Sequence, residues 1–453
     1  MNIFTLIHQK SEIQPEQLAY SSREEHAGLT YRELVARAEK TATWIIERGC
    51  NAGDRCGLML GDGGEFLTTA LGILAAGLCL VPIATFLAEE ELDHVLGTAR
   101  LHWLYGRDRN LVRTPYAGPV DGANDEEFRR CDPAYIRFTS GTTGRRKGIL
   151  LGHRTIIDRL NAANAVLRID SNDLVWFALP IVDHFIVSIL LYLSQGATIL
   201  DVSTTEDALT FADLNRPTVI YGAPGFFETL IHSETGSLDR LRLAISTTAP
   251  LPPRVAAGFA ARFGKSLNPA LGIIEVGLLS LNTRPEKIGS VGRPMPAYAI
   301  TLVAEDGKRA QPGRPGELHV KGPGLLDAYI GPWRPAPPLM TPYGYATGDF
   351  AWIDADGYLF LVGRGKNRLL VNGIEFFCEE VETVLNSLPG VAESRVFVDR
   401  FSQTLSAELV GSPGPTERLV ETLKGLIDSR KVPKSFFIVQ DLPRTPNGKL
   451  RRG

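Results

Sequence analysis

The segment FTSGTTGRRKG at residues 138–148 places four hydroxyl side chains, three glycines and three cations within eleven positions. Glycine lets the backbone approach a ligand closely and adopt positive φ. Successive backbone N–H groups in such a loop can form an anion-binding nest. The hydroxyl side chains add donors and Lys147 adds a mobile positive charge; the hydroxyls belong to Thr139, Ser140, Thr142 and Thr143. These residue types predict a polyphosphate site.

This loop is not a Walker A sequence. The spacing from Gly141 to Gly144 is too short, and Gly148 follows the lysine where Ser or Thr is required. A flexible surface turn is the alternative interpretation. Residues 134–138 alternate as in a strand, and residues 148–163 are typical of a helix. The loop is therefore expected to leave the end of a strand, where α/β proteins bind ligands.

Composition excludes several classes of protein. The 453 residues are enough for two or more domains, and 44% hydrophobic with 22% charged residues is typical of a globular protein. A net charge of −3 gives no reason to expect nucleic acid or an anionic membrane. Five scattered cysteines without a CxxC motif indicate a reducing cytoplasm and argue against structural zinc.

Neither a signal peptide nor a membrane span is predicted. The N-terminus lacks a basic start followed by a long apolar stretch. The most apolar run, residues 66–86, contains glycines and a proline. We therefore expect it to be a buried helix that leads into a buried strand.

The order of elements predicts an α/β protein. Apolar residues recur at helical spacing in residues 29–49 and 64–77, and strand patterns follow at 54–60, 79–83, 219–224, 242–250 and 265–272. This alternation favours helix-covered parallel sheets. Short strands with turns indicate a small β-rich subdomain at about 290–365. The expected organisation is a large domain at 1–365 and a small, hinged α+β C-terminal domain at 366–453.

With these features together, the chain resembles the adenylate-forming superfamily: acyl-CoA and aryl-CoA synthetases, adenylation domains of peptide synthetases, and luciferases. The phosphate loop is one of several matching motifs, and they occur in the order of the family over nearly the whole chain. The others include LGIIEVG, GELHVKGPGLLDAYI, YATGDF and PRTPNGKLRR, which begin at Leu271, Gly316, Tyr345 and Pro443.

The resemblance implies a two-step reaction that uses ATP and Mg²⁺. A carboxylate attacks the α-phosphate of ATP, and a thiol then displaces AMP from the acyl-adenylate. Thr139 to Lys147 would wrap the β- and γ-phosphates, and Glu275 would lie near Mg²⁺. Asp349 and Arg364 would bind the ribose. Taken singly, these residues could equally be a turn cap, a surface carboxylate or a surface cation.

Three positions depart from the usual pattern of the family. Arg146 replaces a proline before the lysine of the loop, which removes a φ restraint and adds a cation. Leu271, next to Gly272, replaces the aromatic residue that stacks on adenine, and Ile274 replaces a threonine before the glutamate. We expect these changes either to lower the affinity for ATP or to be compensated by other residues that bind it. The alternative is a homologue without catalytic activity.

The small domain carries the remaining residues implied by the resemblance. Lys449 on the Pro446–Gly448 turn would reach into the active site and bridge the acyl carboxylate and the α-phosphate. Lys366 occupies the hinge position, where many relatives have aspartate. Gly373 is the best match for a residue beside the thiol channel after the small domain rotates.

The acid substrate is less defined. The candidate lining is mostly apolar with a few hydroxyls, and its residues are Asp183, His184, Phe185, Tyr221, Gly222, Pro224, Ser246 and Thr247. An amino-acid substrate would need Asp183 to pair with its ammonium group. We favour an aromatic or medium-length acyl acid, with an amino acid as the second choice.

The thiol acceptor is expected to be coenzyme A or a separate phosphopantetheinyl carrier protein, because no carrier motif occurs in the sequence. Two other classes stay open. One is a non-catalytic nucleotide-binding homologue, which pyrophosphate exchange would distinguish from an enzyme. The other is a monooxygenase of the luciferase kind, which would need a luciferin pocket besides the adenylation motifs.

Overall fold

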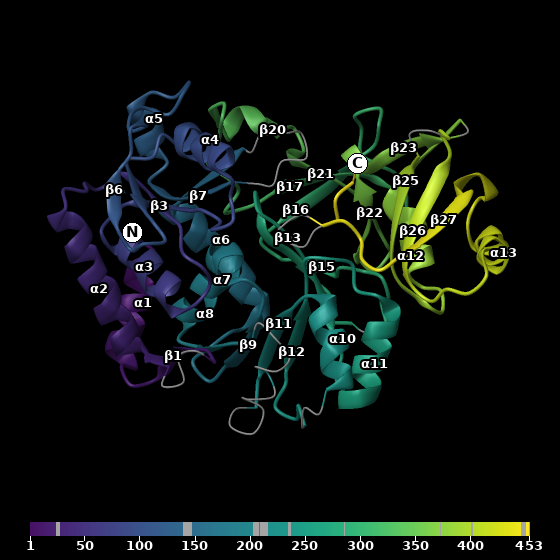
Figure 1. Cartoon of the computed structure of the whole chain (residues 1–453), viewed down its shortest axis with the longest axis horizontal. Helices are drawn as coiled ribbons and strands as arrows, with labels where there is room; N and C mark the ends of the chain where they lie inside the picture. The colour runs from purple at the N-terminus through teal and green to yellow at the C-terminus, as the bar shows by residue number, and fades with distance from the viewer. Residues whose placement is uncertain are drawn as a thin grey trace.

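Two large sheets form the main body of the protein (Figure 1). The computed structural model describes residues 1–23, 28–138, 147–202, 208, 216–233, 237–284, 286–371, 373–399, 402–444 and 450–452. Within these residues, one sheet has nine strands in the order β15-β14-β13-β12-β11-β9-β10-β1-β2. Its strands are β1 (Leu18–Ser21), β2 (Leu29–Thr30), β9 (Leu174–Ala178), β10 (Thr198–Asp201), β11 (Val219–Gly222), β12 (Leu243–Ser246), β13 (Asn268–Ile273), β14 (Gly277–Leu281) and β15 (Arg293–Pro294).

The second sheet has eight strands within the described part of the chain, in the order β19-β18-β8-β7-β4-β3-β5-β6. Its strands are β3 (Arg55–Leu58), β4 (Cys79–Pro82), β5 (Trp103–Tyr105), β6 (Leu111–Arg113), β7 (Pro133–Phe138), β8 (Gly148–Gly152), β18 (Ala328–Ile330) and β19 (Arg334–Pro335). Parallel neighbours dominate the middle of both sheets, as the alternation of helices and strands predicts.

Helices fill the space between the two sheets and cover their outer faces. The largest core cluster joins both sheets through α1 (Phe4–Ile13), α2 (Tyr31–Glu47), α3 (Gly64–Ala75), α6 (His153–Leu167), α7 (Ile181–His184), η1 (Phe185–Ile189) and α8 (Leu190–Gln195). A second cluster packs α4 (Glu89–Ala99) and α5 (Asp125–Arg130) on the outer face of the eight-stranded sheet. A third packs α10 (Pro224–His232) and α11 (Pro253–Phe263) on the outer face of the nine-stranded sheet.

Local sequence accounts for several of these elements. At the start of α2, the Thr30 hydroxyl accepts from the Glu33 N–H at 3.2 Å and the Glu33 carboxylate accepts from the Thr30 N–H at 2.9 Å. This reciprocal cap satisfies two N–H groups that a helix N-terminus otherwise leaves unpaired. The apolar run at 66–86 is the buried helix α3 leading into buried β4, as predicted. No helix in the described part of the chain is long and apolar enough to cross a membrane.

One expectation about the glycine-rich loop is wrong. Residues 148–152 are not the start of a helix but form β8, which pairs antiparallel with β7 and, on its other edge, with β18. All five residues of β8 are buried, and both edges of this strand are hydrogen-bonded within the sheet. The helix α6 begins only at His153. The loop therefore connects two antiparallel strands.

The β-rich region is a five-stranded sheet within the described residues. Its strands are β16 (Ala299–Val303), β17 (Gly316–Lys321), β20 (Met340–Thr341), β21 (Gly344–Ile353) and β22 (Leu359–Arg364). Residues 328–335 fall inside the predicted subdomain range but belong to the eight-stranded sheet as β18 and β19. The chain therefore leaves the β-rich region once and returns to it.

The C-terminal elements gather at one end of the molecule (Figure 1). They are β23 (Arg368–Val371), β24 (Ile374–Phe377), α12 (Cys378–Leu385), β25 (Val391–Val398), β26 (Leu405–Gly411), α13 (Thr416–Leu426) and β27 (Ser435–Val439). Their apolar side chains form a core cluster of their own between Val371 and Val432. A domain boundary at residues 365/366 stays a prediction, and this separate core supports it.

Candidate active site

The predicted phosphate loop lies between β7 and β8. Its residues Thr139, Ser140, Gly141, Thr142, Thr143 and Gly144 lie outside the described part of the chain. Lys147 is described and exposed, immediately before the buried strand β8. An exposed cation at this point is available to an anion bound at the loop. The role of the loop stays a prediction.

Glu275 lies in the tight turn between β13 and β14 and begins a chain of hydroxyl groups. Its Oε1 accepts a hydrogen bond from the Tyr329 hydroxyl at 3.0 Å. The Tyr329 and Tyr345 hydroxyls are 2.5 Å apart. Burial, followed by the charge of Glu275, raises the pKa of both tyrosines above the ordinary value. Both phenols therefore stay protonated at neutral pH and can donate hydrogen bonds.

Three backbone carbonyls of this turn are held by residues distant in sequence. Arg159 of α6 donates from Nη1 to the Ile274 carbonyl at 2.8 Å. The Leu326 N–H donates to the Glu275 carbonyl at 2.8 Å, and the Tyr298 hydroxyl donates to the Val276 carbonyl at 3.1 Å. The turn is thus fixed on several sides, and with it the position of the carboxylate.

Arg159 is itself a buried cation. It is 4% exposed, and burial lowers its pKa from the ordinary value to about 10. Besides the Ile274 carbonyl, it donates from Nε to the Gly324 carbonyl at 2.5 Å. The guanidinium therefore joins α6 to the Glu275 turn and to the segment that precedes β18.

Asp349 and Arg364 form a pair on adjacent antiparallel strands. Their Cα atoms are register partners of β21 and β22, and Arg364 Nε lies 2.8 Å from Asp349 Oδ1. Asp349 is buried, whereas the Arg364 side chain is 48% exposed. The charge of Asp349, like that of Glu275, contributes to the raised pKa of Tyr345. Both negative charges therefore disfavour ionisation of the same tyrosine.

The segment predicted to contact adenine lies on β13. Leu271 is half-buried and Gly272 is exposed. A Cβ placed on Gly272 would meet a single atom within 4 Å, the Gly277 carbonyl oxygen at 3.9 Å. The backbone at Gly272 is therefore open to a flat ligand, and an aliphatic side chain is next to it.

The predicted acid pocket divides between two faces of the nine-stranded sheet. Tyr221 stacks on Phe177 at 5.4 Å between ring centroids and meets His184 edge-on at 5.8 Å. Burial raises the pKa of Tyr221, which hydrogen bonds with Ser188 and Thr247 partly oppose. Tyr221, Thr247 and His184 therefore share the inner face of the sheet.

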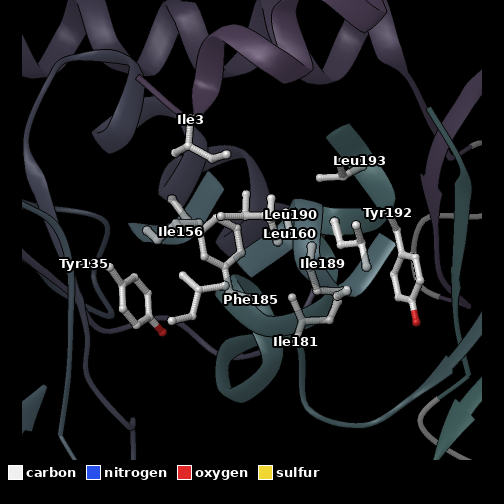
Figure 2. Packing of buried hydrophobic residues seen from close by; sticks show 14 of the residues in the cluster. Ile3, Tyr135, Ile156, Leu160, Ile181, Phe185, Ile189, Leu190, Tyr192 and Leu193 are labelled. Carbon is white, nitrogen blue, oxygen red and sulfur yellow. The ribbon is translucent and has the colours of Figure 1, made fainter. Parts of the chain in front are cut away.

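Three other candidates for pocket lining are directed elsewhere. Gly222 and Ser246 pair across β11 and β12, and strand alternation places them on the outer face, toward α10. Phe185 is fully buried and its ring contacts those of Phe66 and Tyr135. Figure 2 shows Phe185 among the buried side chains of the core. Phe185 is part of the core in this structure, and its role in lining the acid pocket stays a prediction.

Asp183 has a cationic partner that the sequence analysis did not identify. Nη2 of Arg137 lies 2.7 Å from Asp183 Oδ1, and Nη1 donates to the Asp183 backbone carbonyl. The two side chains are 21% and 30% exposed. Arg137 is a charged residue at the end of an otherwise apolar strand, and this pattern could have indicated a buried ionic partner.

Three further residues of the site were not predicted individually. Tyr329 and Tyr345 lie inside the motifs that begin at Gly316 and Tyr345, whereas no local pattern indicates a role for Arg159.

The small domain contributes fewer described residues to the site. Lys449 lies outside the described residues, but Arg444 and Leu450 on either side of its segment pair as an antiparallel bridge. Lys366 lies in the short helix η3 (Gly365–Asn367), where burial, followed by the charge of Arg364, lowers its pKa. Gly373 is exposed, with φ of +75°, in the turn between β23 and β24.

Known proteins resemble the chain over nearly its full length. The AMP-binding enzyme model matches residues 7–330, and the AMP-binding enzyme C-terminal domain matches residues 380–449. Feruloyl-CoA synthase of Amycolatopsis sp is 28% identical over 94% of each chain. The p-hydroxybenzoic acid–AMP ligase FadD22 of Mycobacterium tuberculosis is 29% identical over 94% of this chain and 64% of its own length.

Solved structures extend this similarity to the fold. MatB from Rhodopseudomonas palustris with bound ATP has a TM-score of 0.84 at 25% identity, over 99% of this chain and 97% of that chain. The apo form of MatB has a TM-score of 0.77 over the same shares. The protein belongs to the AMP-binding enzyme family, the adenylate-forming superfamily that its motifs resemble.

Proposed function

We propose that this protein is an ATP-dependent acid–thiol ligase. A carboxylate oxygen attacks the α-phosphorus of ATP and pyrophosphate leaves. The sulfur of a thiol then attacks the acyl carbonyl, AMP leaves, and the thiol proton passes to solvent. The observation that carries the proposal is the polar chain from Glu275 through Tyr329 to Tyr345, whose last member shares strand β21 with Asp349 of the Asp349–Arg364 pair. These residues bring together carboxylates, which can bind Mg²⁺ and ribose hydroxyls, and phenol hydroxyls, which can donate hydrogen bonds.

Each polar group has a role in this proposal. Asp349 accepts hydrogen bonds from the ribose hydroxyls, and Arg364 orients its carboxylate. Lys147 neutralises charge on the phosphates. Phosphoryl transfer depends mainly on such positioning and charge neutralisation. Lys449 bridges the carboxylate and the α-phosphate during adenylation.

Glu275 would hold Mg²⁺ together with phosphate oxygens. One carboxylate oxygen already accepts from Tyr329, which orients the group. Among the described residues, no group of three or more His, Cys, Asp or Glu side chains could hold a metal alone. The phosphates would therefore supply the other ligands, and the cation would neutralise the charge that they develop.

The side chains on the inner face of the sheet favour a carboxylic acid that carries no ammonium group. Tyr221, His184 and Phe177 form an aromatic cluster there, in which Tyr221 and Phe177 are buried and His184 is partly exposed. Asp183 is already compensated by Arg137, so it is a poor receptor for an ammonium group. The names of feruloyl-CoA synthase and p-hydroxybenzoic acid–AMP ligase support an aryl acid. A medium-length acyl acid is also compatible with these aromatic side chains, and an amino acid stays the alternative.

We propose coenzyme A as the thiol acceptor, with a phosphopantetheinyl carrier protein as the alternative. The name of feruloyl-CoA synthase supports the first choice. Relatives named as peptide synthetases, such as PhsC of Streptomyces viridochromogenes, support the second. Five cysteines without a pairing pattern fit a reducing compartment, so we also propose a cytoplasmic location.

Exchange of labelled pyrophosphate into ATP, across a panel of acids, tests the proposal. Ferulic and p-hydroxybenzoic acids and medium-length fatty acids should support exchange, whereas amino acids should not. Adding coenzyme A should then yield the thioester by chromatography. Exchange with amino acids alone would overturn the substrate class. No exchange with any acid would favour a non-catalytic nucleotide-binding homologue.

A further inference from the structure

Arg368 connects the small domain to the large one, two residues after the proposed hinge at Lys366. Its Nη1 lies 2.7 Å from Oε1 of Glu305, in the turn between β16 and β17, and 3.0 Å from Oε2 of Glu375 on β24. Its guanidinium carbon lies 4.7 Å from the ring centroid of Phe350 on β21 and 5.0 Å from that of Phe377 on β24. Glu305 and Phe350 therefore precede the hinge in the chain, and Glu375 and Phe377 follow it.

These four contacts respond differently to rotation of the small domain. Glu375 and Phe377 lie in the same small β-hairpin as Arg368, so these contacts move with it. Glu305 and Phe350 lie in the large domain, so their contacts with Arg368 hold only in the arrangement seen here. The Phe350 and Phe377 rings, 5.1 Å apart, are also separated by rotation.

Arg368 lines a cavity and is mostly shielded from solvent. A cavity of about 450 Å³ lies between the five-stranded sheet and the β23–β24 hairpin, and Glu305, Phe350 and Arg368 are among its lining residues. The Arg368 side chain is only 20% exposed, although Glu305 is 74% exposed. Arg254 of α11 makes a second crossing contact, from Nη2 to the Ala392 carbonyl at 3.1 Å.

This arrangement of domains is closer to a nucleotide-bound state. The whole chain superposes better on the ATP-bound form of MatB than on its apo form, with TM-scores of 0.84 and 0.77 over equal shares of the chains. The arrangement in which Arg368 reaches Glu305 therefore resembles the ATP-bound form of MatB more than the apo form.

We infer that Arg368 is a positioning residue, which together with Glu305 and Phe350 holds the small domain in the adenylating arrangement. The bridge acts through the small domain, because it keeps that domain against the large one while the acid attacks ATP. The inference rests on the proposed two-step reaction with domain rotation. It adds an ion pair whose strength sets the balance between the two half-reactions.

The ratio of the two half-reaction rates measures that balance directly. If rotation is faster than chemistry, each rate is proportional to the population of its arrangement. The ratio of adenylation to thioester formation is then proportional to the equilibrium constant between arrangements. Adenylation is followed by pyrophosphate release in single turnover, and thioester formation by supplying presynthesised acyl-adenylate with coenzyme A.

Glu305→Gln should lower this ratio about two- to fivefold, the range expected when one exposed ion pair is lost. Glu375→Gln is the matched control, because it removes an ion pair from the same Nη1 atom within the small domain and should not lower the ratio. Arg368→Gln should lower the ratio at least as far as Glu305→Gln does. Adding Glu305→Gln to Arg368→Gln should change nothing more, since the two changes remove one interaction.

Two results would overturn the inference while leaving the proposed function intact. One is an unchanged ratio in Glu305→Gln when both half-reactions of the unaltered protein are active. The other is an equal fall in the ratio for Glu375→Gln, which would indicate a general effect of the hairpin. Absence of both half-reactions in the unaltered protein would instead overturn the proposed function. Thermal melting of each variant separates a change in the ratio from loss of folding.

Discussion

At the scale of single residues, the charge around a side chain decides what it can bind. The carboxylate of Asp183 lies 2.7 Å from Nη2 of Arg137, so its negative charge is compensated within the protein. Lys147 is exposed before a buried strand. The first side chain is therefore poorly suited to a charged ligand, whereas the second is available to one.

Asp183→Asn should have only a mild effect on activation of a neutral acid. Asparagine can still accept a hydrogen bond from Arg137, and a partly exposed ion pair contributes about 1 kcal/mol or less. We expect the KM for the acid in pyrophosphate exchange to change less than about tenfold, since that factor corresponds to about 1.4 kcal/mol. Complete loss of exchange would show that Asp183 holds the substrate, and an ammonium group would then be its natural partner.

Lys147→Ala should raise the apparent KM for MgATP and lower turnover. One lost charge-assisted contact corresponds to about 1.5–3 kcal/mol, or about one to two decades. Initial rates of pyrophosphate exchange at varied MgATP measure the effect. Lys424→Ala is a control, because Lys424 is an exposed lysine on α13 of the small domain. An unchanged ATP dependence of Lys147→Ala would exclude the phosphate assignment.

At the scale of elements, the β13–β14 turn depends on contacts from other parts of the chain. Arg159 from α6, the Leu326 N–H and the Tyr298 hydroxyl each donate to one of its carbonyls. Tyr329 from β18 then orients the Glu275 side chain. The carboxylate is therefore positioned by packing between elements and not by its own hairpin alone.

Arg159→Gln should lower the free energy of unfolding and raise the Mg²⁺ concentration that pyrophosphate exchange requires. The change leaves the buried carbonyl of Gly324 and the part-buried carbonyl of Ile274 without their donor, and losing the donor of a buried carbonyl costs about 1–3 kcal/mol. Urea unfolding should show this loss of stability, and exchange rates at varied Mg²⁺ should show a higher requirement. Arg154→Gln on the same helix removes an exposed pair with Asp158 and should change stability by less than about 1 kcal/mol. Equal effects of both changes would rule out a specific role for Arg159.

At the scale of the whole molecule, the separate apolar cluster of the C-terminal elements and a short linking helix set the possible motions. The small domain has its own apolar cluster, and η3 with Lys366 lies between that cluster and the strand β22. A hinge must absorb a large change of backbone dihedral angles. We therefore expect the two half-reactions to use different arrangements of the large and small domains.

Lys449→Ala should slow adenylate formation by about 10² or more, the usual scale for losing one preorganised electrostatic group. In the second half-reaction the carboxylate no longer exists, and rotation carries Lys449 away. Supplied with presynthesised acyl-adenylate and coenzyme A, this variant should form thioester at nearly the unaltered rate. Equal damage to both half-reactions would argue against domain rotation.

Lys366→Pro should have the opposite effect, because proline fixes φ and restricts rotation at the hinge. Adenylation should continue while thioester formation from presynthesised adenylate falls. Lys366→Ala removes the same charge without restricting φ, so it should retain both half-reactions. A similar loss of thioester formation in Lys366→Ala would mean that the charge, and not the backbone freedom, is required.

Much of the fold could be predicted from the sequence, because its signals are local. The cap of α2 needs only Thr30 and Glu33, three residues apart, and the buried run through α3 and β4 needs only continuous apolar residues. The α+β character expected of residues 366–453 is also present. The ordered motifs identified the superfamily because each requires particular residue types within a few positions.

The tertiary structure decided which residues meet. Glu275 and Tyr329 are 54 positions apart, and Arg137 and Asp183 are 46 apart, so no local pattern could pair them. The residues 148–152 became a strand because β7 and β18 supply partners on both edges, which the sequence of that segment does not reveal. Phe185 became part of the core, where its ring contacts those of Phe66 and Tyr135. Composition and spacing act along the chain, whereas charge compensation, strand register and burial depend on distant segments that only folding brings together.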